Sequence, residues 1–331
     1  MLTKRQNLLE TIHGGKPDRF VNQFEFMVQP WGVDPVSLGN PSPWEPGQET
    51  VDGWGVTIRW VNGQPGAFPV HDAAHKVLKD ITKWKDTVTC PKVVYPAVEW
   101  EATQKIFEAV DRKEQYAAFP IFPGVFEQLH YLMGVDDTLA NFYEEPGYMK
   151  ELIDYITDYE LRYAEEYIKY LKPDAAFHHD DWGTQRSSFM SPEMFEEFLL
   201  PAYKKIYGYY KSHGIELIVH HADCYAANLV PYMIEMGIDI WQGCISSNNV
   251  PELVKKYGPK ISFMGDLDNG VLDKSDWSGE IIRKEVERAC SSNGKLYFIP
   301  NLTMGGDMST FPGVYEATSK EIERMSREMW K

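Results

Sequence analysis

Residues 215–224 read IELIVHHADC, an apolar run that changes abruptly into imidazole and carboxylate groups. The apolar part has the length of a buried strand, and the stretch then ends in His220, His221 and Asp223. Strands of a parallel sheet are near-continuous apolar runs, and their carboxyl ends meet on one face of the protein. The stretch therefore predicts a parallel α/β sheet with a functional group of side chains at that face.

Two other segments change in the same way. Residues 175–181 read AAFHHDD, and residues 295–307 read KLYFIPNLTMGGD. We expect the polar ends of all three segments to share one pocket. Successive side chains of a strand point to opposite faces, so only one histidine of each adjacent pair can face a barrel axis. About half of the histidines are therefore expected to be structural, and His221 and Asp223 share one parity.

Strand-like and helix-like segments alternate along most of the chain. The expected strands are 20–26, 116–122, 175–179, 215–221, 238–243, 260–265 and 295–300. This alternation favours a parallel sheet with right-handed crossovers. An eight-stranded (β/α) barrel needs one more strand, which we place near residues 93–95, and a doubly wound sheet remains an alternative. No nucleotide-binding glycine motif is found.

The amino-terminal region has its own signals. Thr3 can cap a helix that Gly14-Gly15 ends, and the strand 20–26 delivers Glu25 near its end. Residues 30–70 are rich in Trp, Gly and Pro and are expected to form an insertion with a β-hairpin over the barrel mouth. We expect residues 1–331 to form a single distorted TIM-barrel domain.

Helices are also marked further along the chain. Helical periodicity covers residues 98–113. Ser191 and Pro192 begin another helix, and Pro201 is expected to break it before a second piece that runs to Gly214.

The composition of the chain argues against several classes of function. The 331 residues carry a formal net charge of −16, which opposes binding to nucleic acid and to anionic membranes. No apolar run approaches the length of a membrane span, so a cytoplasmic protein is expected. The four cysteines form no CxxC pair, which argues against a disulfide framework and a thiolate zinc knuckle.

Several motifs, in order, resemble the uroporphyrinogen decarboxylase superfamily. They are the opening TKR…LL…GGKPDR of residues 3–19, DGWGV of residues 52–56, DDWGTQ…SPEMF…P of residues 180–201, and HHAD…GID of residues 220–239. The resemblance covers nearly the whole chain. It implies a single distorted TIM barrel with its site at the carboxyl ends of the strands.

The superfamily has two main branches. Decarboxylases carry an arginine-bearing loop after the first strand that holds the carboxylates of a tetrapyrrole, whereas residues 25–30 here read EFMVQP. The resemblance therefore favours the other branch, the cobamide-dependent methyltransferases. Several of these hold zinc with a His-x-Cys element and a distant cysteine.

The present sequence departs from that zinc pattern. Asp223 stands in the cysteine position after His221, and no cysteine occurs near Pro300-Asn301. Activation of a thiol is therefore disfavoured, and any zinc should be bound more weakly than by thiolates. Imidazole and carboxylate groups suit an oxygen substrate, either by donating a proton or by holding a metal ion that polarises an ether.

We therefore predict a corrinoid-dependent methyltransferase that moves a methyl group from a small methyl ether, for instance an aromatic one, to cob(I)alamin on a partner corrinoid protein. The catalytic candidates are His221, Asp223, Asp181, His178, His179, Asp180 and Glu25. The substrate-binding candidates are Trp31, Trp54, Trp60 and position 123, a proline. Asp180 could instead cap a turn, Glu25 could pair with Arg19, and Cys224 could be a buried thiol or a ligand.

Alternative functions remain at this point. They are methyl transfer to a thiol or another acceptor, decarboxylation, and binding of a small molecule or corrinoid without catalysis. For the methyltransferase, the hairpin of residues 44–66, with Trp54 and Trp60, is the expected docking rim for the corrinoid protein.

Overall fold

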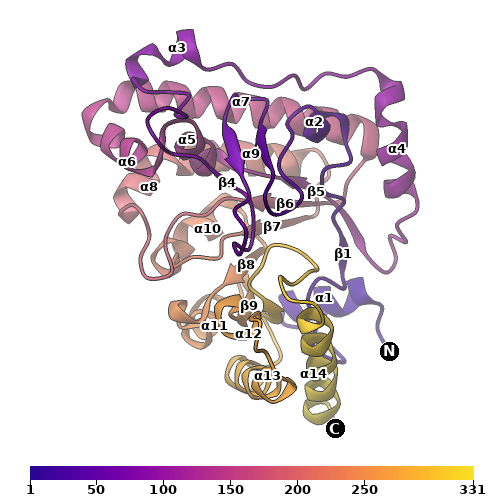
Figure 1. The fold of residues 1–331 in the computed structure, drawn as a ribbon. Helices are drawn as coiled ribbons and strands as arrows, with labels where there is room; N and C mark the ends of the chain where they lie inside the picture. The colour runs from indigo at the N-terminus through magenta and orange to yellow at the C-terminus, as the bar shows by residue number, and fades with distance from the viewer.

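A computed structural model describes residues 1–331 as a curled, half-barrel parallel sheet surrounded by helices (Figure 1). Its seven strands are β1 (Met27–Val28), β5 (Tyr116–Ile121), β6 (Ala175–His179), β7 (Leu217–His221), β8 (Ile240–Cys244), β9 (Ser262–Leu267) and β10 (Phe298–Leu302). Their order in the sheet equals their order in the chain, and every neighbouring pair is parallel. This sequential order confirms the TIM-barrel-like fold and excludes a doubly wound sheet, in which the order would reverse.

The predicted strands and the observed ones agree closely for β5 to β10. Strand β6 has the predicted bounds, and β7 to β10 begin two or three residues later than predicted. The predicted strand 20–26 is wrong, because the chain turns there and Gln23 adopts a left-handed φ of 51°. Residues 93–95, where we expected an eighth strand, have no regular structure.

Three further expected helical regions are confirmed with small changes. Helix α1 (Lys4–Ile12) begins with a capping box between Thr3 and Gln6. Helix α8 (Pro192–Phe198) is capped by the Ser191 side chain, and α9 (Leu200–Ser212) starts one residue before Pro201. The helix expected at 98–113 is α4 (Ala97–Glu108).

The remaining helices follow the strands in turn. They are α3 (Trp84–Thr87), α5 (Val125–Met133), α6 (Val135–Glu144), α7 (Pro146–Leu171), α10 (Val230–Met236), α11 (Val250–Tyr257), α12 (Asn269–Leu272), α13 (Gly279–Asn293) and α14 (Val314–Met329), with three short 3-10 turns, Ile81–Lys83, Ala227–Leu229 and Ser246–Asn248. None of these helices, α7 included, is long and apolar enough to cross a membrane.

The two faces of the sheet pack into two separate cores. The larger core lies between the sheet and the outer helices, and the smaller one fills the inside of the curl. Leu8 and Ile12 of α1 belong to the inner core, so α1 closes the floor at the amino ends of the strands. Arg5 fastens this floor by donating to Asp174 and Glu216, which precede β6 and β7.

The insertion consists of α2 (Pro35–Leu38) and a small antiparallel sheet of β2 (Glu49–Val51), β3 (Thr57–Arg59) and β4 (Phe68–Pro69). Figure 1 shows it in indigo and purple in front of α7 and α9. Asp34 anchors it, because this buried carboxylate accepts hydrogen bonds from the hydroxyls of Tyr163 and Tyr167 on α7. The hairpin expected within residues 44–66 is part of a three-stranded sheet, and its first turn covers residues 52–56.

Candidate active site

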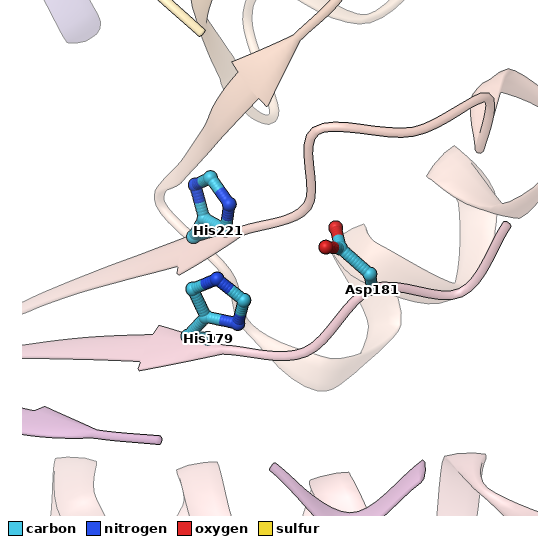
Figure 2. Close-up of side chains that lie close together, drawn as sticks. All are labelled: His179, Asp181 and His221. Carbon is cyan, nitrogen blue, oxygen red and sulfur yellow. The ribbon is translucent and has the colours of Figure 1, made fainter. Parts of the chain in front are cut away.

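Two histidines on neighbouring strands face each other at the carboxyl end of the sheet. His179 ends β6 and His221 ends β7, and the two are register partners with ring centroids 4.2 Å apart. Asp181 follows β6 and turns its carboxylate toward them (Figure 2). One ligand atom from each of the three residues lies within 4.8 Å of the others. We call His179, Asp181 and His221 the triad.

The alternation of the strands explains which histidines meet. Phe177 and Val219 belong to the inner core, so His179 and His221, two residues further on, also point inward. His178 and His220 point outward and are fully buried beneath the helices. The expectation that one histidine of each pair faces the axis is thereby confirmed.

The outward histidines have partners on the helices. His178 Nε2 lies 2.8 Å from the Glu160 carboxylate of α7, and His220 Nδ1 lies 2.7 Å from the Tyr207 hydroxyl of α9. His220 also stacks on the Trp182 ring at 4.1 Å. His178, which we had included among the catalytic candidates, is sealed behind the sheet and does not join the triad.

His179 is held by a glutamate that the sequence did not single out. Its Nδ1 lies 2.8 Å from Glu127 Oε2 at the start of α5. Asp180 fixes this arrangement, because its carboxylate accepts hydrogen bonds from the backbone N–H groups of Phe126 and Glu127 at 2.9 and 2.8 Å. Asp180 is thus the cap of α5, and its position aims Glu127 at His179.

His221 is held by an amide. Its Nδ1 is hydrogen-bonded to Gln242 Oε1 on β8. Gln242 Nε2 donates to Asn301 Oδ1 at 2.8 Å and to the Met304 carbonyl at 3.0 Å, so its oxygen must be the atom that faces the histidine. Because that oxygen can only accept, the proton of His221 lies on Nδ1 and Nε2 is left with a free lone pair. The polar end of the third segment, 295–307, thus supports the site through Asn301.

Asp223 and Cys224 lie beside the triad but outside it. The Asp223 backbone N–H donates to Asp181 Oδ1 at 2.8 Å, which places both carboxylates at the mouth of the barrel. Burial, followed by the negative charges of Asp181 and Glu127, raises the pKa of Asp223 well above its usual range. Burial likewise raises the pKa of the Cys224 thiol, so this residue is a buried thiol and not a member of the cluster.

The electrostatics of the site favour a cation. Burial lowers the pKa of His179 and of His221 to about 4, so both imidazoles are neutral at pH 7. Burial and the nearby Asp181 raise the pKa of Glu127. None of the three carboxyl groups, Glu127, Asp181 and Asp223, pairs with a lysine or arginine, and the imidazole that Glu127 contacts, His179, is neutral.

The triad has the donor types of a catalytic zinc site. Such sites use three imidazole or carboxylate ligands and keep one position open for substrate. Ligating histidines usually donate their other N–H to a carboxylate or carbonyl, and Glu127 and Gln242 stand in those places. The residues therefore fit a zinc ion, and the group consists of three of the catalytic candidates, without Asp223 and the region of Asn301, where the zinc pattern would have its cysteines.

A cavity of about 170 Å³ lies between the insertion, α7 and the end of β5, and we call it the aromatic pocket. Trp31, Trp54 and Pro123 line it, as does Phe122, whose ring lies 4.6 Å from the His179 ring. The structure thus brings three of the substrate-binding candidates together in one cavity, and Phe122 lies between this cavity and His179.

Glu25 and Trp60 lie elsewhere. Glu25 precedes β1, near the amino ends of the strands, where Arg19 lies 3.9 Å from its carboxylate. Its predicted place at a strand's carboxyl end is wrong because the strand starts later. Trp60 donates its indole N–H to the Gln64 carbonyl in the hairpin and does not line the pocket.

Trp54 is not a docking residue either. It is 3% exposed and packs edge-on against Tyr159 of α7, so a partner protein could not reach it. The predicted contact of Trp54 with a corrinoid protein is therefore wrong.

Comparison with known proteins places the chain in a family. The model of the uroporphyrinogen decarboxylase (URO-D) family matches residues 54–324. A methyltransferase from Methanosarcina mazei has a similar structure, with a TM-score of 0.70 and 14% sequence identity over 100% of both chains. A GH18 chitinase from Pseudoalteromonas aurantia aligns with 70% of this chain, over 83% of the chitinase chain, at 14% identity. Its TM-score of 0.38 is too low to indicate a shared fold.

The search of curated proteins gives no match. At 14% identity, the likeness to the methyltransferase concerns the fold alone. The match of the family model, in contrast, covers most of the chain, including β6, β7 and the triad. The chain therefore belongs to the uroporphyrinogen decarboxylase family.

Proposed function

We propose that this protein is a corrinoid-dependent methyltransferase that removes the methyl group from a small methyl ether and passes it to cob(I)alamin on a partner protein. The observation that carries the proposal is the triad, a set of imidazole and carboxylate donors without a thiolate, beside an apolar aromatic pocket. Such donors suit an oxygen leaving group better than a thiol.

Decarboxylation of a tetrapyrrole fits the site poorly. A substrate with many carboxylates needs cationic partners, and the bidentate arginine is the usual one. Residues 25–30 contain no arginine, and the mouth instead presents Glu127, Asp181 and Asp223. The likeness of the whole chain in fold to a methyltransferase is in keeping with the other branch of the family.

A zinc ion fits His179, Asp181 and His221. When bound, it would supply a Lewis acid that stabilises negative charge on the ether oxygen. The chain's own contribution is to orient the ligands: Glu127 and Gln242 bind the two Nδ1 atoms, and neither Nε2 atom has a hydrogen-bond partner in the protein.

The proposed reaction also needs a proton donor. In the proposed reaction the methyl–oxygen bond breaks, its electron pair stays on oxygen, and the methyl group passes to the cobalt of the acceptor. An alkoxide or phenolate is a poor leaving group, so a proton delivered to it lowers the barrier. Asp223, next to Asp181 at the mouth, is the carboxyl group that we assign to this delivery.

The partner must approach the same mouth. A methyl group held beside the triad can reach cobalt only if the corrinoid-bearing protein covers the carboxyl ends of the strands. The insertion offers an exposed apolar contact there, because Trp44 is 66% exposed and borders the aromatic pocket. We assign Trp44 the docking role that the buried Trp54 cannot have.

A methyl-transfer assay tests this proposal. The protein is incubated with cob(I)alamin and separate panels of methyl ethers, methyl thioethers and methylamines, and methylcobalamin is followed by its absorption spectrum. We expect product with at least one ether. A binding protein without catalysis would give none, and a preference for thioethers would support methyl exchange with thiols instead.

A further inference from the structure

The loop that follows β10 forms a wall of the candidate site. A Cβ atom placed on Gly305 would lie 3.2 Å from both Cε1 and Nδ1 of the His221 imidazole. Atoms in favourable van der Waals contact are about 3.5–4.0 Å apart, so a residue without a side chain fits best here. The backbone of the loop therefore packs directly on the His221 ring, and the ring can shift toward it only if the loop moves.

The same loop also holds Gln242, the amide that accepts from His221. The two N–H groups of Gln242 Nε2 have two close acceptors, Asn301 Oδ1 at 2.8 Å and the Met304 carbonyl at 3.0 Å. Without the Met304 carbonyl, one of these N–H groups would lose its close acceptor, and the amide would be freer to turn over. Its NH2 group would then face His221 Nδ1, and the imidazole proton would have to move to Nε2, which could no longer bind a metal ion.

Asn269, the first residue of α12, holds Met304 in place. Its Oδ1 accepts the Met304 backbone N–H at 2.8 Å and the Thr303 hydroxyl at 3.2 Å. Its Nδ2 donates to Asp273 Oδ2 at 2.9 Å. Because a carboxylate only accepts, Asp273 fixes which end of the Asn269 amide faces the loop. Asn269 thus presents its oxygen to the loop residue whose carbonyl holds Gln242.

The far end of the loop is fastened to the same short helix. Asp273 is 8% exposed and accepts the backbone N–H groups of Thr310 and Phe311 at 2.6 and 2.9 Å. Asn269 and Asp273 therefore hold the loop at both ends, although α12 contributes no residue to the triad. Its influence on the site passes through the backbone of the loop.

We infer that Asn269 is a positioning residue of the triad. Through Met304 it keeps the Gln242 amide in the orientation in which His221 carries its proton on Nδ1 and offers the lone pair of Nε2 to a metal ion. Asn269 contacts neither the triad nor the substrate. The consequence for zinc rests on the proposed function, whereas the position of the His221 proton is a property of the metal-free protein.

Nuclear magnetic resonance of the metal-free protein tests the inference without zinc. With the imidazole nitrogens labelled, correlation spectra at neutral pH show which nitrogen of His221 is protonated, and the His221→Ala spectrum assigns the signals. We expect Nδ1–H in the wild type and in Asn62→Leu, a control in the exposed hairpin. Asn269→Leu should populate the Nε2–H form. An Nε2–H form in the wild type, or an unchanged Nδ1–H form in folded Asn269→Leu, would overturn the inference.

Zinc affinity gives a second measurement. Asn269→Leu should weaken binding by about 10-fold, the lower end of the range for residues that orient metal ligands, because it acts through Gln242. Asn62→Leu should leave the affinity unchanged. Competition with a chromophoric chelator measures both. Equal affinity of folded Asn269→Leu and the wild type would show that the loop does not need this anchor.

A pair of adjacent glycines decides if Asn269→Leu fails to fold. Gly305→Ala places a methyl group against the His221 ring, whereas the same atom on Gly306 meets only the flexible Met308 side chain, at 3.2 Å. Gly305→Ala should therefore weaken zinc binding by about 10-fold, and Gly306→Ala should not. Equal effects of the two changes would contradict the role of the loop as a wall of the site.

The outcomes separate this inference from the proposed function. A wild type that binds no zinc, with the tautomer shift of Asn269→Leu as expected, would contradict the zinc of the proposed function and leave the positioning role standing. Zinc binding by the wild type, with tautomer and affinity unchanged in Asn269→Leu, would contradict this inference alone.

Discussion

The inner and outer faces of β6 and β7 carry the same residues and use them differently. On the inner face, His179 and His221 stack at 4.2 Å beside Asp181, at the mouth of the barrel. On the outer face, His178 and His220 stack at 5.8 Å but are sealed beneath α7 and α9. Adjacent residues of each strand thus have different roles: one histidine lies in the candidate site, and its neighbour packs against the helices.

The hydrogen-bond partners of the four histidines explain this difference. The inner histidines are hydrogen-bonded through Nδ1, and their Nε2 atoms have no hydrogen-bond partner in the protein. The outer His178 instead uses Nε2 on a buried carboxylate of α7, Glu160. Free lone pairs that converge can hold a ligand, whereas a satisfied buried pair can only hold the helix to the sheet.

The largest effect is expected on the outer face. Replacing His178 by Ala leaves the Glu160 carboxyl buried without its partner, which should lower the free energy of unfolding by about 3–5 kcal/mol. Urea denaturation followed by circular dichroism measures this. A loss as small as that of an exposed control such as His75→Ala would show that the outer pair contributes little.

On the inner face the expected effect is on turnover. His221→Ala and Asp223→Ala should each slow methyl transfer by about 10²-fold or more while the unfolding midpoint stays close to that of the wild type. Rates are compared per folded molecule in the cob(I)alamin assay. Near-normal rates in well-folded variants would remove these residues from the chemistry.

A smaller effect is expected at Gln242, which is hydrogen-bonded to His221 of the triad. Gln242→Ala removes the acceptor for His221 Nδ1–H and should weaken zinc binding by about 10–100-fold. Competition with a chromophoric chelator measures the affinity. If the affinity is unchanged, the amide does not orient His221.

The smallest effect is expected at the hairpin. Trp60 contacts its own turn and neither the pocket nor the triad, so Trp60→Ala should change the transfer rate less than about twofold with free cob(I)alamin, within the range of ordinary surface substitutions. Trp44→Ala should slow transfer to the protein-bound corrinoid alone. Equal slowing with both acceptors would contradict the docking role of Trp44.

The sequence predicts the strands and the facing of their side chains well, because apolar runs and alternation are local properties. It predicts the first strand, near the amino end, at the wrong residues. The apolar alternation of residues 20–26 reflects packing in the barrel floor, and the left-handed Gln23 bends the chain into a turn.

The supporting residues of the site could not be found in this way. Glu127 lies in an ordinary amphipathic helix, and only the strand end at Pro123-Gly124 hints that this helix begins at the mouth. Gln242 lies inside a strand, and its role depends on register with His221 on the neighbouring strand. Such roles arise from contacts across the sheet, which no local pattern records.

The most direct test of the division between the two faces is a zinc titration of the metal-free protein by calorimetry. We predict one zinc per chain for the wild type and for His220→Ala, and loss of that site in His221→Ala. Tight stoichiometric binding by His221→Ala, or no binding by the wild type, would contradict the assignment of the inner face as the reactive centre.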